Sequence, residues 1–138
     1  MEIRRGQKSD LEWLRGNDHH VGSEWIERCL NHGEYILAVE GHNTNGFLRF
    51  SLFWGKIPYM DLIWVVPNHR RQGLGTALLG FWEREMRQRG ATVLMTSSVA
   101  DELEPQAWHK RNGFKEAGQL TFGRYAPTPE VFFVKDLT

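Results

Sequence analysis

A glycine-containing turn that leads into a helix start carries the clearest chemistry in the sequence. The segment 67–75, PNHRRQGLG, places two arginines and two glycines directly before an amphipathic stretch that begins at Thr76. A helix start leaves about four amide hydrogens unpaired and carries about half a positive charge. Gly73 and Gly75 would let the backbone come close to a ligand. The pattern therefore predicts a site for a phosphate-like anion.

The same residues also have a plainer interpretation, in which the glycines only shape a turn and the arginines form a solvated face. Two common nucleotide-binding patterns bear on which anion could bind here. The P-loop ends in Gly-Lys-Ser/Thr, and the dinucleotide fingerprint needs three glycines and a later acidic residue. Neither is present, so ATP and NAD are disfavoured.

The elements that must position this turn follow from hydrophobic periodicity and turn residues. Leu78, Leu79, Trp82 and Met86 fall on one face of a helix predicted from Thr76 to Arg89, with Gly90 as its cap. The other predicted helices cover 9–14, 23–30 and a short stretch with Pro105 at its first position and Gly113 at its end. The predicted strands cover 1–5, 35–40, 47–54, 59–66, 92–97, a stretch from 114, and 131–135.

This order of elements mixes antiparallel hairpins with a strand-helix-strand crossover around the helix at Thr76. Gly41 to Asn45 is predicted to be the connection of the first hairpin. We therefore expect the α+β class, with a mixed, mostly antiparallel central sheet of about seven strands flanked by about four helices. No linker or repeat interrupts the chain, so residues 1–138 are expected to form a single domain.

Composition narrows the function classes. Hydrophobic residues make up 41% of the chain, which indicates a globular protein, and 17 basic residues balance 17 acidic ones. No global field attracts nucleic acid or anionic lipid, so we expect neither as a partner. The longest apolar run, Leu62 to Val66, is far shorter than a membrane span, and the single Cys29 cannot form an internal disulfide. A cytoplasmic location is expected.

Two motifs together resemble those of one family. The first is Arg70-x-x-Gly73-x-Gly75, preceded by a strand that ends in Val65-x-Pro67. It resembles the acetyl-CoA motif of the GNAT superfamily of N-acetyltransferases. The second, Ala107 to Phe114 with the sequence AWHKRNGF, looks like that family's helix and strand start ending in Gly-Phe. The likeness in element order covers nearly the whole chain.

The resemblance implies acetyl-CoA as co-substrate, without a metal. The backbone of the strand from Ile63 to Val66 would bind the pantetheine arm, and a backbone amide near Val65 would stabilise the oxyanion. The pyrophosphate would meet the amides of the following turn. The implied cofactor-binding residues are Ile63, Val65, Val66, Arg70, Arg71, Gln72, Gly73, Leu74, Gly75 and Thr76.

The resemblance also implies catalytic residues, because acetyl transfer needs a neutral amine, a polarised carbonyl and a protonated leaving thiolate. Asp61 stands where family members often carry an acidic residue and is the candidate base; a polar strand-edge residue is the alternative. His109 stands where the family usually has tyrosine. An imidazole can protonate a thiolate, so His109 is the candidate acid, and a structural role beside Trp108 is the alternative.

The function implied is transfer of an acetyl group from acetyl-CoA to a primary amine, by direct attack in a ternary complex. The acceptor is a small molecule, a protein N-terminus or a lysine, and the sequence does not choose among them. The missing tyrosine motivates a rival, an acyl-CoA-binding regulatory module without catalysis. A cluster of aromatic and other apolar residues is more typical of a core than of a substrate site, but it is also a candidate homodimer interface; its members are Phe50, Leu52, Phe53, Trp54, Tyr59 and Met60.

Overall fold

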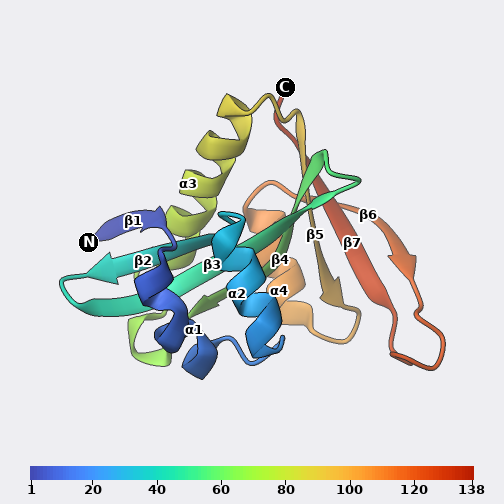
Figure 1. Cartoon of the computed structure of the whole chain (residues 1–138). Helices are drawn as coiled ribbons and strands as arrows, with labels where there is room; N and C mark the ends of the chain where they lie inside the picture. Colours follow the sequence, from blue (N-terminus) through green and yellow to red (C-terminus); the bar gives the residue numbers. More distant parts are fainter. The chain divides into compact units, whose positions relative to one another are not determined.

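The computed structural model describes all residues from 1 to 138 and contains seven strands and four α-helices (Figure 1). Short 3-10 turns at Lys8–Asp10 and Pro67–His69 precede α1 and α3. The elements are, in chain order, β1 (Glu2–Arg5), α1 (Leu11–Asn17), α2 (Ser23–Asn31), β2 (Tyr35–Glu40), β3 (Asn43–Phe53), β4 (Ile57–Val65), α3 (Leu74–Gln88), β5 (Val93–Val99), α4 (Leu103–Arg111), β6 (Lys115–Leu120) and β7 (Glu130–Asp136).

The strands pair in the order β1-β2-β3-β4-β5-β7-β6. Strands β4 and β5 pair in parallel, with Tyr59 opposite Met95, because the chain between them includes the crossover helix α3. The pairs β1/β2, β2/β3, β5/β7 and β6/β7 are antiparallel. The predicted fold class, a mixed and mostly antiparallel sheet of seven strands with four helices, is confirmed.

Contacts group the chain into two compact units, each made of two segments. The first unit joins Met1–Phe50 with Leu62–Arg84. Its strands alternate between two faces: Tyr35 and Leu37 on β2 pack with Leu14 of α1 and Ile26 of α2. On the other face, Phe50 of β3 meets Trp82 of α3, with ring centroids 5.9 Å apart. Helices therefore cover both faces of β2 and β3 within this unit.

The second unit joins Ser51–Asp61 with Glu85–Thr138. Along β5 the residues Leu94, Thr96 and Ser98 are buried, and on β7 Val131 and Phe133 are buried with them. Helix α4 packs on this face. The intervening residues, among them Ser97 and Phe132, point to the opposite face and are only partly buried. One face of this unit therefore keeps its polar side chains accessible.

Most element boundaries differ from the prediction by a few residues, and three of the differences have a clear physical meaning. Strand β3 begins at Asn43, so the hairpin connection is shorter than Gly41 to Asn45. Helix α3 begins at Leu74, before Thr76, because burial of Leu74 in the core outweighs the low helix propensity of the glycines beside it. Pro105 is the third residue of α4, which it tolerates because first-turn amides have no helical acceptor.

Candidate functional site

The turn between β4 and α3 is anchored on the end of β4 by three hydrogen bonds. The amide of His69 donates to the carbonyl of Val66 at 2.8 Å, and the amide of Arg70 donates to that of Pro67 at 3.3 Å. The Arg70 side chain then turns back, and its Nε donates to the Val65 carbonyl at 2.9 Å. Arg70, predicted as a cofactor contact, thus fixes the turn to the strand with one edge of its guanidinium.

The backbone of this turn presents a row of amide donors at the helix start. The first α3 hydrogen bond in the turn runs from the Ala77 amide to the Gly73 carbonyl at 3.0 Å. The amides of Leu74, Gly75 and Thr76 therefore precede the helical ladder. Gly73 has φ +80°, a left-handed conformation that favours glycine, although a Cβ there would meet no atom within 4 Å. Backbone conformation, not crowding, requires glycine at this position.

The electrostatics of the turn favour an anion. No acidic residue lies in the first turn of α3, and Arg71 beside Gly73 is exposed. Arg71 itself adopts φ 64°, which is uncommon for a residue with a side chain. Left-handed residues alternating with ordinary ones turn successive amides toward one side and make an anion-binding concavity. The predicted residues Arg71 to Thr76 are brought together in this arrangement.

The β4 backbone divides the predicted pantetheine contacts into two groups. The Val66 amide donates to the Asn45 carbonyl of β3 at 2.8 Å, so Val66 holds the turn and its amide is used within the chain. Because successive residues of a strand direct their amides to opposite edges, the amides of Ile63 and Val65 point away from β3. Only these two keep the orientation that the predicted contact with pantetheine requires.

A glycine lets β3 and β4 approach at this point. A Cβ on Gly46 would lie 2.9 Å from the Trp64 carbonyl oxygen, closer than real contacts allow. The β2/β3 register shifts between Ala38 and Val39, next to this contact.

A hollow of about 240 Å³ opens beside the turn, lined by Met1, Glu40, Asn45, His69, Gln72 and Leu74.

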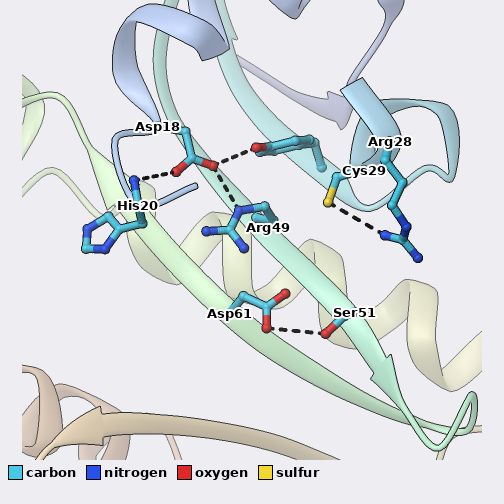
Figure 2. Close-up of polar contacts among 8 residues, drawn as sticks. Asp18, His20, Arg28, Cys29, Arg49, Ser51 and Asp61 are labelled. Atoms are coloured by element: carbon cyan, nitrogen blue, oxygen red, sulfur yellow. Dashed lines mark hydrogen bonds and ion pairs between the residues drawn. The ribbon is translucent and has the colours of Figure 1, made fainter. Parts of the chain in front are cut away.

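In the second unit, acidic and hydroxyl side chains meet on the accessible sheet face. Ser51 of β3 donates to Asp61 Oδ1 of β4 at 3.2 Å (Figure 2). Two residues earlier on β4, the Tyr59 hydroxyl lies 2.5 Å from Ser97 Oγ of β5. Ser97 in turn donates to Glu130 Oε2 of β7 at 2.7 Å. The sequence alone did not single out Ser97 or Glu130, because only strand pairing brings them to Tyr59.

His109, the candidate acid, lies in the core of the second unit. Its side chain packs against Phe114 and Phe133, and the residue is 5% exposed. Nε2 lies 2.9 Å from Ser98 Oγ, and Nδ1 has no hydrogen-bond partner. Burial lowers the pKa of the imidazole to about 4, so the ring is neutral at pH 7 and holds no proton acidic enough for a thiolate. The structural role, the alternative for this residue, fits these contacts.

A buried ion pair fixes the connection between α1 and α2 in the first unit. Asp18 Oδ2 accepts hydrogen bonds from Arg49 Nε at 2.8 Å and from the Tyr35 hydroxyl at 2.6 Å (Figure 2). Its Oδ1 accepts from the His20 amide at 3.3 Å. Burial, together with the Asp18 charge, raises the pKa of Tyr35. Sequence reasoning missed this network, although Arg49 stands as a charged residue between the apolar Leu48 and Phe50 on β3.

The sequence is similar to those of known acetyltransferases. A family model described as acetyltransferase (GNAT) family matches residues 3–114. An aminoglycoside N(6')-acetyltransferase type 1 of Acinetobacter haemolyticus is 24% identical over 95 residues, which cover 63% of this chain and 66% of that protein. The chain thus spans just under two thirds of the length of this curated relative.

Solved structures match over nearly the whole chain. An aminoglycoside 6'-N-acetyltransferase complexed with coenzyme A has a TM-score of 0.81 at 17% identity, covering 100% of this chain and 98% of the other. The ribosomal-protein-S18-alanine N-acetyltransferase from Escherichia coli also has a TM-score of 0.81, at 20% identity, covering 99% and 94%. At these identities the likeness establishes the fold alone.

None of the helices combines the length and the apolar character that crossing a bilayer requires.

Proposed function

The chain belongs to the GNAT family of acetyltransferases, and on that premise we propose that it transfers an acetyl group from acetyl-CoA to a primary amine in a ternary complex. The observation that carries the proposal is the row of amides at the α3 start. The amides of Leu74, Gly75 and Thr76 precede the first helical hydrogen bond, beside the left-handed Gly73. A diphosphate of CoA matches such a concavity in charge and in hydrogen-bonding capacity.

The β4 backbone supports the next part of the proposal. The amides of Ile63 and Val65 point away from β3, as the Val66 bond to Asn45 implies. An extended pantetheine arm can hydrogen-bond to such an edge as a further strand would. We assign one of these two amides to the thioester oxygen, where a preorganised donor stabilises the negative charge that develops during acyl transfer.

Asp61 is proposed to hold the acceptor ammonium. It precedes Ile63 by two residues on β4 and is only partly buried, with Oδ1 accepting from Ser51. A carboxylate attracts an alkyl ammonium and orients it by charge-assisted hydrogen bonds. No side chain is assigned as the acid, because the tyrosine of the family motif is replaced by the buried His109.

The acceptor is proposed as a class only, a primary amine on a small molecule or at a protein N-terminus. The aminoglycoside acetyltransferase relative is 24% identical to this chain, and it supports a small polyamine. The likeness to a ribosomal-protein alanine acetyltransferase is one of fold and does not set the acceptor.

An amine panel tests the proposal. The purified chain is incubated with acetyl-CoA and an aminoglycoside, spermidine or a peptide with N-terminal alanine, and free CoA thiol is measured. We expect thiol release with at least one amine, and stabilisation against heat by acetyl-CoA but not by ATP. A ligand at about 100 times its dissociation constant stabilises by about 2.7 kcal/mol. Absence of both effects would refute the proposal.

A second candidate function is an acyl-CoA-binding module without catalysis. The observation that favours it is the buried His109 in the place of the family's tyrosine, which leaves the usual acid position without a usable proton. The same panel separates the two candidates. Stabilisation by acetyl-CoA without thiol release from any amine would support the binding module.

A further inference from the structure

A directed chain of hydrogen bonds joins three strands on the accessible face of the second unit. Ser97 has one hydroxyl proton, which it donates to Glu130 Oε2 at 2.7 Å. The contact of 2.5 Å between Tyr59 and Ser97 must therefore use the phenolic proton, with Tyr59 as the donor. The two hydrogen bonds therefore run in one direction, from Tyr59 on β4 through Ser97 on β5 to the carboxylate of Glu130 on β7. The lone pairs of the Tyr59 oxygen stay available to accept.

The surroundings keep the phenol of Tyr59 neutral. Burial, and the nearby charges of Asp61 and Glu130, raise the pKa of Tyr59 although its bond to Ser97 acts in the opposite direction. These two carboxylates are the ionisable groups that act on the phenol. The Tyr59 ring stacks on Phe132 of β7, with centroids 6.3 Å apart, and the residue opposite Glu130 on β6 is Leu120. The phenol is thus held in place and protonated.

We propose that Tyr59, Ser97 and Glu130 form a proton relay that removes the proton of the acceptor ammonium, with the Tyr59 oxygen as the group that touches the acceptor. The inference rests on the proposed function, since it needs an amine acceptor. It assigns the proton transfer to a route that ends at Glu130, while Asp61 holds the ammonium. Tyr59 and Asp61 lie two residues apart on β4, about 7 Å along the strand, and project from the same face. One ammonium can therefore contact both.

The protons balance along this route. The ammonium gives a proton to the Tyr59 oxygen, the phenolic proton passes to Ser97, and the Ser97 proton passes to Glu130. The neutral amine then attacks the thioester carbonyl, forming the C–N bond, and the C–S bond breaks to release CoA thiolate. The second proton of the nitrogen passes to the thiolate, directly or through water, and Glu130 releases the first proton to solvent, so the products are the amide, CoA thiol and one proton.

A purely structural clamp between β4, β5 and β7 is the alternative role for these contacts, and pH separates the two. Without a relay, only the fraction of acceptor that is already neutral can react, and this fraction rises about tenfold per pH unit below the amine pKa. With a relay, the bound ammonium reacts and the rate is flat in the same range. A relay defect therefore shrinks as pH rises, whereas a structural defect stays constant.

The test compares Ser97→Ala with Ser97→Thr, which keeps a hydroxyl. We measure kcat/KM from pH 6 to pH 9 with the panel amine that the wild type acetylates fastest, and CoA affinity in parallel. Ser97→Ala is expected to lose about 100-fold at pH 7, within the usual range for proton-transfer groups, and to recover about tenfold per pH unit. Ser97→Thr is expected to stay within about threefold of wild type. CoA affinity should not change.

Glu130→Gln should behave as Ser97→Ala does, and Glu116→Gln is its control. Glu116 is an exposed carboxylate on β6 of the same unit, so the control makes the same charge change outside the relay. A deficit that does not vary with pH, wild-type rates in Ser97→Ala, or a Ser97→Thr rate as low as that of Ser97→Ala would overturn the relay while acetyl transfer stands. A wild-type protein that binds CoA but acetylates no amine would overturn the proposed function and the relay with it.

Discussion

Removing the buried imidazole should abolish one component of the pH dependence of folding. His109 sits among Phe114, Phe133 and Trp108 with Nδ1 unpaired and Nε2 on Ser98. We consider His109→Phe together with Ser98→Ala. Replacing both partners of a hydrogen bond by apolar groups of similar shape changes the free energy of unfolding little at pH 7, because no buried polar group is left without a partner.

The magnitude follows from the difference between the folded and unfolded pKa values. The pKa of His109 is about 4 in the folded protein, against an ordinary value of 6.5. As pH falls through about 6.5 the unfolded chain takes up a proton that the folded protein refuses, so stability is complete above this pH and is lost toward pH 4. The loss is at most about 2 kcal/mol between pH 7.5 and pH 5, and about 3 kcal/mol in total.

Urea unfolding at pH 7.5 and pH 5 measures this quantity for the wild type and the double variant. We expect the wild type to lose about 2 kcal/mol more than the variant over this interval. The control is His42→Phe, which changes an exposed ring and should keep the wild-type pH dependence. Equal losses in the wild type and the double variant would refute the reasoning. A large loss of turnover in the double variant at neutral pH would also contradict the structural role of His109.

Three further predictions concern other parts of the molecule. Asp18→Ala should lower the free energy of unfolding by about 3 kcal/mol, measured in urea, because it removes a buried partner of Arg49; an unchanged midpoint would show that the pair contributes nothing. Gly46→Ala should cost about 1 to 3 kcal/mol in the same assay, since its Cβ meets the Trp64 carbonyl, and wild-type stability would show that the strands adjust freely. Asp61→Asn should raise the KM for the acceptor about tenfold with CoA affinity unchanged, and an unaltered KM would exclude Asp61 as the ammonium partner.

Most of the fold was predictable because its signals are local. The helix with Leu78, Leu79, Trp82 and Met86 on one face forms as expected, and its end at Gln88 is one residue from the prediction. Its start was placed two residues too late, since Gly73 and Gly75 resemble a turn in isolation. Only the burial of Leu74 shows that the helix begins there.

The candidate site was predictable where one continuous segment builds it. The turn after β4 contains its own arginines and glycines, so its chemistry can be read from the residues themselves. The relay residues Tyr59, Ser97 and Glu130 meet through the pairing of β4, β5 and β7, and strand order and register are not written in any one segment. The burial of His109 could not be predicted for a related reason: whether a helix side chain faces solvent or core depends on what packs against it.

Calorimetric titration of CoA into the wild type and Gly73→Val tests the central claim most directly, with Gly90→Val as the control. Both glycines are left-handed, at φ +80° and +91°, and a Cβ on either meets no atom within 4 Å. They lie near opposite ends of α3, which is about 22 Å long, so the two substitutions impose similar backbone strain and only one changes the amide row. We expect the wild type and Gly90→Val to bind CoA alike, and Gly73→Val to bind about five- to thirtyfold more weakly, because left-handed strain costs about 1 to 2 kcal/mol. A wild type that does not bind CoA, or a Gly73→Val variant that binds it as the wild type does, would contradict the account.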